Sequence, residues 1–271
     1  MYKLIALDID GTLLNTEKKI TENVFNSIQE AKKSGAKVVL STGRPLPGVT
    51  PLLKELNLTD DGDYVICFNG AVVQEVKSEK VISNIEMSYD DFKTIYKVVK
   101  ELDTKVHINT PTNVITPHEV PSKYTVHEAT LNQIPVVYKS EDDINEDITF
   151  CKIMIIDEPE KLEEVLNVLP KELYDNYTVV RSAPFFLEFL NKKANKGTAL
   201  QSLCENIGID VEHTIAVGDE ENDQHMIHLA GLGVAMGNAR DSIKDIANYI
   251  TKSNNEHGVA HVIDKFILKK I

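Results

Sequence analysis

The 271-residue sequence has no tryptophan, only three cysteines and far fewer basic than acidic residues. Cys67, Cys151 and Cys204 are far apart and form no CxxC pair. This spacing predicts neither a zinc site nor a disulfide framework, and it favours small core residues of a reduced, cytoplasmic protein.

The chain carries 42 acidic and 29 basic residues, which gives a formal net charge of −13, and it has no run of Lys or Arg. Binding to a nucleic-acid backbone requires the opposite sign of charge, so we expect no nucleic-acid partner. An acidic protein that handles an anionic substrate requires a metal ion or a local cationic pocket.

Long apolar runs are also absent, and no segment approaches the roughly 20 apolar residues of a membrane span. The early apolar run at residues 4–7 ends at Asp8 and is too short for a signal peptide. We therefore expect a cytoplasmic protein with no membrane partner, present as a monomer or homodimer.

The most informative stretch is the first predicted strand, where four apolar residues are followed by Asp8, Asp10 and a Gly-Thr pair that ends the strand. Ligands of open parallel sheets bind beyond the carboxyl ends of the strands. Alternation along a strand would direct both carboxylates to one side, where their mutual repulsion requires a cation or a proton. Mg²⁺, a hard ion that prefers oxygen ligands, is the natural candidate.

Strand and helix signals alternate through residues 1–83 and again from residue 196, which predicts βαβ units and a doubly wound, Rossmann-like parallel sheet. Between these parts the pattern changes to a mixture of helices and a hairpin-like alternation at residues 105–117. We therefore predict a discontinuous α/β core at residues 1–83 and 189–271, interrupted by an α+β cap domain at residues 84–188.

Polar residues also follow two other predicted strands. Thr42 and Gly43 offer a hydroxyl and an unhindered amide, which suit phosphate oxygens. Asp219 and Asp223 are four positions apart and share a face if a helix begins between them. Lys196 opens another helix, where the helix dipole disfavours a cation unless an anion lies nearby.

Four stretches resemble, in order, the motifs of the haloacid dehalogenase-like hydrolases, and the insert is similar to the α/β cap of the Cof-type branch. The motifs are Asp8-Ile9-Asp10-Gly11-Thr12, Thr42-Gly43-Arg44, Lys196, and Gly218-Asp219-Glu220-Glu221-Asn222-Asp223.

The resemblance implies a phosphatase that hydrolyses small phosphorylated metabolites, with sugar phosphates the leading class. Asp8 would be the nucleophile that forms an aspartyl-phosphate, and Asp10 would act as general acid and base. Mg²⁺ would be held by the Asp8 carboxylate, the Asp10 backbone carbonyl and Asp219.

The resemblance also implies a set of residues that hold the transferring phosphoryl group. Asp223 would be a supporting residue that orients Lys196 or a metal-bound water. The phosphate-binding set would be the Ile9 amide, Thr42, Gly43, Lys196 and Asn222.

Two other functions use similar residues. A phosphomutase shares the nucleophile but returns the phosphoryl group to a second sugar hydroxyl, so the reaction product distinguishes it. A receiver-type signalling module also clusters acids and a lysine around Mg²⁺, but Asp10 would shorten the life of its phosphoaspartate, and it needs no cap.

Residues 185–190, Phe-Phe-Leu-Glu-Phe-Leu, are expected to form the strand that returns to the core. Glu188, the one charge in that run, either faces the cleft or faces solvent. Arg44 either pairs with a carboxylate or touches substrate. The sequence does not decide between these alternatives.

Overall fold

Strand β1 (Leu4–Leu7) occupies an inner position of an eight-stranded sheet in the computed structural model, which describes residues 1–271. All four residues are fully buried, as expected for an apolar strand covered on both faces. The strand order is β14-β13-β12-β1-β2-β3-β4-β5; the first six strands are parallel, and β4 pairs antiparallel with both β3 and β5. The other strands are β2 (Lys37–Ser41), β3 (Tyr64–Cys67), β4 (Val72–Glu75), β5 (Val81–Asn84), β12 (Thr214–Gly218), β13 (Leu232–Ala235) and β14 (Tyr249–Ile250).

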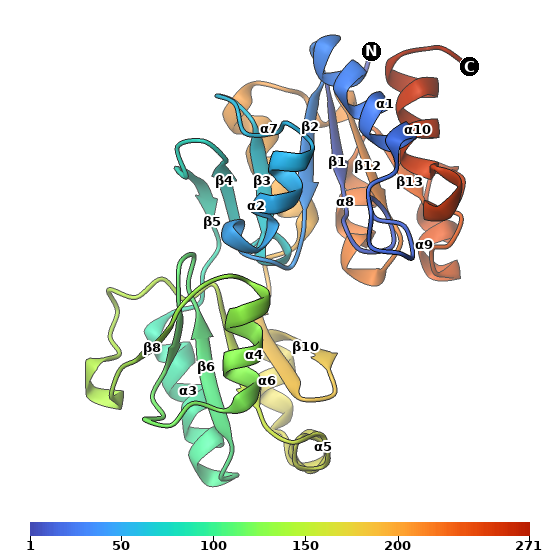
Figure 1. Ribbon diagram of the computed structural model, residues 1–271. Coiled ribbons are helices and arrows are strands. Elements are labelled where there is room, and N and C mark those ends of the chain that lie inside the picture. The colour runs from blue at the N-terminus through green and yellow to red at the C-terminus, as the bar shows by residue number, and fades with distance from the viewer. The chain divides into compact units, whose positions relative to one another are not determined.

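Helices cover both faces of this sheet (Figure 1). The β1-to-β2 and β12-to-β13 connections run outward in opposite directions, so right-handed crossovers place α1 and α8 on opposite faces. Helices α7 and α8 pack against Leu4 and Ala6 of β1, whereas α1 contacts α10. The helices are α1 (Glu22–Lys33), α2 (Leu46–Glu55), α7 (Lys196–Ile207), α8 (Gln224–Leu229), α9 (Asp241–Ile246) and α10 (Gly258–Val262), with short turns η1 (Phe68–Gly70), η3 (Val211–His213), η4 (Glu221–Asp223), η5 (Asn254–Glu256) and η6 (Ile263–Ile267).

Successive strands are added outward from β1 on one side and outward from β12 on the other, which creates a topological switch point between these two parallel strands. In doubly wound folds, ligands bind beyond the carboxyl ends of the strands at such a point. The predicted doubly wound α/β fold is confirmed, and β1, β2 and β12 are the strands whose ends meet there.

Contacts between residues divide the chain into two units: residues 1–43, 50–84 and 195–271 form the first, and residues 44–49 and 85–194 form the second. The second unit has a six-stranded sheet of order β10-β11-β9-β6-β7-β8, antiparallel except for the β7–β8 pair. Its elements are α3 (Tyr89–Glu101), β6 (Lys105–Asn109), β7 (Val114–Thr116), α4 (Lys123–Leu131), β8 (Val136–Tyr138), η2 (Glu141–Asp143), β9 (Lys152–Ile156), α5 (Pro159–Val168), α6 (Lys171–Asn176), β10 (Tyr177–Ala183) and β11 (Phe186–Asn191).

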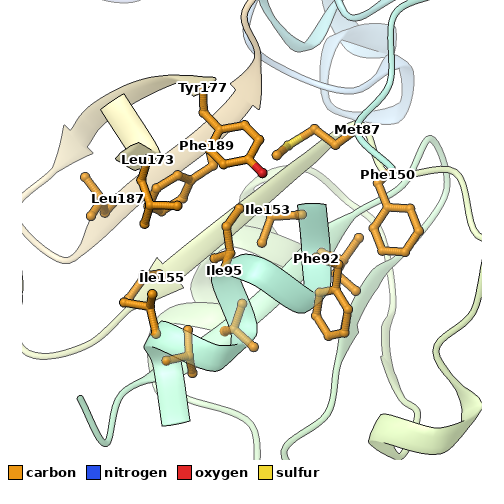
Figure 2. Packing of buried hydrophobic residues seen from close by; sticks show 14 of the residues in the cluster. Met87, Phe92, Ile95, Phe150, Ile153, Ile155, Leu173, Tyr177, Leu187 and Phe189 are labelled. Carbon is orange, nitrogen blue, oxygen red and sulfur yellow. The ribbon is translucent and has the colours of Figure 1, made fainter. Parts of the chain in front are cut away.

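One face of the second sheet forms an apolar core with α3. Helix α3 begins at a capping box, in which Ser88 and Asp91 exchange hydrogen bonds, and it buries Phe92 and Ile95. Figure 2 shows these residues beside Ile153 and Ile155 of β9. Because side chains alternate along β9, Lys152 and Met154 belong to the opposite face of the sheet.

The prediction that residues 185–190 return to the core sheet was wrong. Residues 186–190 lie in β11, which pairs with β9 and β10 in the sheet of the second unit, and Phe185 directly precedes that strand. An apolar run of strand length shows that a strand is buried but not in which sheet. The predicted boundary at residue 189 therefore falls inside a strand, and the first unit resumes only at Asn195.

None of the helices has the length and apolar composition needed to span a lipid bilayer.

Candidate active site

Three neighbouring strands of the first unit end in the predicted site residues. Strand β1 ends at Leu7 and is followed by Asp8, β2 ends at Ser41 and is followed by Thr42, and β12 ends at Gly218 and is followed by Asp219. Because β12, β1 and β2 are adjacent and parallel, their carboxyl ends lie at one edge of the sheet. The fold thus gathers residues that are more than 200 positions apart in the chain.

Lys196 connects two of the aspartates. Its Nζ lies 2.6 Å from Asp8 Oδ1 and 2.7 Å from Asp223 Oδ1, and the lysine is completely buried. Helix α7 begins at Lys196, behind a capping box in which Asn195 accepts a hydrogen bond from the Thr198 amide. The anionic partner expected for a lysine at a helix N-terminus is therefore a pair of carboxylates.

Both carboxylate oxygens of Asp223 accept hydrogen bonds. Oδ1 accepts from Lys196, and Oδ2 accepts from the backbone amides of Asp219 (2.9 Å) and Glu220 (3.1 Å). These bonds fix the loop after β12 against α7.

Carboxylate oxygens of Asp8, Asp219 and Asp223 lie within 4.8 Å of one another, which makes a potential metal-binding cluster. Thr12 Oγ1 donates to Asp219 Oδ1 at 2.8 Å. Gly11 has φ +87°, and a Cβ there would lie 2.2 Å from Asp219 Oδ2, so the approach of Asp219 requires glycine at this position.

Two carboxylates of this cluster, those of Asp8 and Asp219, are destabilised as anions. Burial raises the pKa of Asp8 to about 8, although Lys196 opposes the shift, and burial raises the pKa of Asp219 to about 6. Burial disfavours the charge of Lys196, but Asp8 and Asp223 outweigh it and raise the pKa of that lysine. The site therefore has more negative groups than one ammonium neutralises, and its oxygen-only donors suit a hard divalent cation.

Asp10 occupies a different environment. Since β1 ends at Leu7, both Asp8 and Asp10 lie beyond the strand, and strand alternation does not determine where Asp10 points. The Asp10 side chain is 47% exposed and forms an ion pair with Lys18 at 2.9 Å. It does not belong to the three-aspartate cluster.

Thr42 and Asn222 are linked through Asn69. The Asn69 amide donates to the Thr42 carbonyl at 2.9 Å, and Asn222 Nδ2 donates to Asn69 Oδ1 at 3.2 Å. Phe68 and Asn69 have φ values of 50° and 54°, in the left-handed region that non-glycine residues rarely adopt. Such strained backbone persists where the surrounding structure enforces it, often at functional sites.

Sequence reasoning missed three residues that shape this site: Thr12, Asn69 and Asn238, whose Nδ2 donates to the Gly11 carbonyl at 2.8 Å. A signal existed for two of them. Thr12 lies inside the first motif, and Asn69 directly follows the buried strand β3. Asn238 lies in a loop with no recognisable pattern.

A sequence profile of the haloacid dehalogenase-like hydrolases matches residues 5–263. The chain belongs to this family. The hydrolase is 45% identical to the protein YxeH of Bacillus subtilis (strain 168), whose name assigns it a provisional phosphatase activity, and the match covers 100% of both chains.

Two further relatives carry more specific names. The phosphatase YcsE of Bacillus subtilis (strain 168), named for 5-amino-6-(5-phospho-D-ribitylamino)uracil, is 34% identical over 98% of the hydrolase and 96% of its own length. The solved structure of the subclass IIB sugar phosphatase BT4131 matches with a TM-score of 0.74 and 26% identity, covering 97% of the hydrolase and 98% of that chain. A closer resemblance of residues 88–91, 124–128 and 251–254 to the bacterial sugar phosphatase YidA stays a prediction.

The pKa of Asp219 leads to a stability prediction for the metal-free protein. Because the native state holds this proton up to about pH 6, whereas the unfolded chain releases it near pH 4, wild-type stability falls as the pH rises through that window. Asp219→Asn cannot titrate, so it should be more stable than wild type by about 1–2 kcal/mol above pH 6, after allowance for solvent screening, and show little gain near pH 4.

Urea unfolding in EDTA at pH 4.5, 6 and 8 measures this difference. Asp241→Asn, at an aspartate whose side chain is 98% exposed, is the control and should change little. An Asp219→Asn protein that is less stable than wild type at pH 8 would contradict the electrostatic argument.

Proposed function

We propose that this hydrolase is a Mg²⁺-dependent phosphatase that hydrolyses small phosphomonoesters, sugar phosphates foremost, through a covalent intermediate on Asp8. The observation that supports it most directly is the position of Asp8 at the end of β1, in contact with buried Lys196 and beside Asp219. The names of the relatives support the phosphatase class, and the sugar phosphatase BT4131 supports the substrate class.

In the first half of the reaction, an Asp8 oxygen attacks phosphorus as the ester P–O bond breaks. Asp10 gives its proton to the departing alcohol oxygen, so a neutral alcohol leaves. The products of this step are an aspartyl-phosphate and the alcohol.

In the second half, the Asp10 carboxylate takes a proton from water as that water attacks phosphorus. The Asp8–phosphorus bond breaks, and inorganic phosphate and the Asp8 carboxylate are released. Each turnover thus consumes one water and restores both aspartates.

Lys196 neutralises Asp8 and lies where a phosphoryl oxygen would need a cation. The proposed phosphate-binding set is completed by Thr42, Gly43, Asn222 and the Ile9 amide. Asn69 positions two of them, because it hydrogen-bonds to both Thr42 and Asn222.

The cation site is assigned to Asp8, Asp219 and the Asp10 carbonyl. Asp223 lies in the same cluster, but both of its oxygens already accept hydrogen bonds, so it positions Lys196 and the Asp219 loop instead. When bound there, Mg²⁺ would supply positive charge that lets Asp8 and Asp219 ionise together and that stabilises phosphoryl oxygens.

All of these residues belong to the first unit, and the phosphate and the cation are all that they recognise. We therefore assign discrimination between leaving groups to the second unit, which corresponds to the cap predicted from the sequence.

Asp8→Asn keeps the shape of the side chain but removes the anionic nucleophile. Phosphate release from a sugar phosphate should fall by about 10³-fold or more, with an unchanged far-UV circular dichroism spectrum. Asp241→Asn is the matched control. Release of phosphate by Asp8→Asn at a rate near that of wild type would exclude the covalent mechanism.

Asp10→Ala leaves the nucleophile in place but removes the proton donor. Hydrolysis of a sugar phosphate should slow by about 10²–10⁴-fold, while 4-nitrophenyl phosphate, whose phenolate leaves with little protonation, should slow much less. Lys18→Met, which removes an ion-pair partner of Asp10 and keeps the Asp10 carboxyl group, is the control. Equal losses on both substrates would refute the acid–base role.

Treatment with EDTA should abolish activity, and Mg²⁺ should restore it. Ca²⁺ should bind and inhibit, because its larger and looser coordination shell would misplace Asp8 for attack. Asp219→Asn should need a higher Mg²⁺ concentration for half-maximal rate. Full activity in EDTA, with metal analysis confirming that the protein holds no divalent cation, would contradict the proposed requirement for Mg²⁺.

A further inference from the structure

The turn η1, which follows β3, contacts parts of the candidate site that come from other strands and from α7. It consists of residues 68–70. The Asn69 backbone amide donates to the Thr42 carbonyl at 2.9 Å. A Cβ on Gly70 would lie 2.2 Å from the Asn195 carbonyl oxygen, so the turn packs directly against the backbone at the start of α7.

The backbone of η1 is left-handed at each of its three residues. The φ values are 50° at Phe68, 54° at Asn69 and 100° at Gly70. Asparagine and glycine adopt this conformation more readily than other residues, whereas the bulky Phe68 adopts it at a cost. Such a conformation persists because the surrounding structure enforces it. The turn therefore holds Asn69 in one place, hydrogen-bonded to both Thr42 and Asn222.

The two ends of the Asn69 side-chain amide have different surroundings. Its Oδ1 accepts a hydrogen bond from Asn222 Nδ2 at 3.2 Å. This bond sets the orientation of the amide and leaves the N–H groups of Asn69 Nδ2 without an acceptor in the protein. The residue is only half-buried, so a ligand can reach Nδ2. Because an amide nitrogen only donates, that ligand must present an acceptor.

Asn69 Nδ2 lies against Gly43, a residue of the proposed phosphate-binding set. A Cβ added to Gly43 would be only 3.3 Å from Asn69 Nδ2 and 3.4 Å from its Oδ1. Glycine at position 43 thus allows the Asn69 side chain to approach the backbone closely. The hydrogen bonds to Thr42 and Asn222 place Asn69 beside two further members of the same set. The free donor therefore lies among residues that are proposed to hold phosphoryl oxygens.

The phosphoryl group of a substrate has the chemistry that this position requires. Its nonbridging oxygens are anionic acceptors, and a hydrogen bond to an ionised group is about twice as strong as one between neutral groups. A metal ion would gain nothing from Asn69 Nδ2, because an amide nitrogen has no lone pair available for coordination.

We propose that Asn69 is a further phosphate-binding residue, whose Nδ2 donates a hydrogen bond to a nonbridging oxygen of the substrate phosphoryl group. This inference rests on the proposed function and adds a residue to its phosphate-binding set. The turn η1 holds this donor against Gly43, while Oδ1 of the same amide positions Asn222. Because the donor meets the phosphoryl group and not the leaving group, it contributes equally to the hydrolysis of different phosphomonoesters.

Two substitutions remove the donor and keep the left-handed backbone. Asn69→Gly deletes the side chain, and glycine adopts this φ without steric cost. Asn69→Asp keeps an oxygen that accepts from Asn222 but replaces Nδ2 with an anionic oxygen. We expect Asn69→Gly to lower kcat/KM by about 10–100-fold, because a hydrogen bond to a charged group is lost. Asn69→Asp should lower it by about 10²-fold or more, because its carboxylate also repels the phosphoryl group.

Two further measurements report on contact with the phosphoryl group itself. The loss in Asn69→Gly should be similar for a sugar phosphate and for 4-nitrophenyl phosphate, in contrast to the loss in Asp10→Ala. The inhibition constant of inorganic phosphate should rise by about tenfold. Asn57→Gly and Asn57→Asp are the matched controls, because Asn57 is an exposed asparagine of the same unit with φ 53°. They should change neither measurement, and an Asn69→Gly loss confined to one of the two esters would overturn the proposal.

A double-mutant cycle distinguishes a phosphate donor from a residue that only positions Asn222. If Asn69 acted through Asn222 alone, Asn69→Gly would have no further effect in an Asn222→Ala protein. We expect a further loss of about tenfold in that background. No further loss there, or an Asn69→Asp rate within about twofold of wild type on both esters, would overturn the proposal.

Thermal unfolding checks that the variants fold. Should Asn69→Gly not fold, Asn69→Ala, which is also uncharged, takes its place. Wild-type protein that hydrolyses both esters, with the Asn69 variants equally active, would refute this inference alone. No hydrolysis of any ester by the wild type would refute the proposed function and this inference with it.

Discussion

The contact of one buried ammonium group with two aspartates is the constraint around which the candidate site of the first unit is arranged. Lys196, at the start of α7, contacts both Asp8, which follows β1, and Asp223, which lies in the turn after β12. It therefore connects two parts of the sheet that are distant in the chain. The carboxylates converge although they repel one another, and α7 must begin close to the sheet edge. Gly11 permits this convergence, because any side chain there would collide with Asp219.

Such a site is held together by the rest of the fold and does not stabilise it. Burial raises the pKa values of Asp8 and Asp219, which means that their charged forms are disfavoured where they lie. The fully buried strand β1 and the helices on both faces of the sheet supply the apolar burial that offsets this cost. Left-handed backbone at Phe68 and Asn69 is a second local cost at the same edge.

The sequence was sufficient for the parts of this structure that depend on local pattern and chain order. Alternating strands and helices predicted the doubly wound sheet, and polar residues after apolar strands predicted Asp8, Thr42 and Asp219 at one edge. It was insufficient where partners are chosen by tertiary packing. The run at residues 185–190 reads as a buried strand in either sheet, and only its pairing with β9 places it in the second unit. Lys152 likewise shows no sign of its burial, because a single lysine in an apolar strand does not reveal what faces it.

The two buried lysine clusters use the same ion pairing but leave different atoms free. In the first unit, backbone amides donate to Asp223, so the free oxygens belong to Asp8 and Asp219, whose pKa values are raised by burial. In the second unit, buried Lys152 pairs with one oxygen of Glu128 and one of Glu188, and no backbone amide intervenes. The second oxygen of each glutamate accepts no hydrogen bond, and the Asn109 amide oxygen is buried without a partner. The same pairing of a buried lysine with two carboxylates therefore leaves oxygen atoms in different surroundings free in the two units.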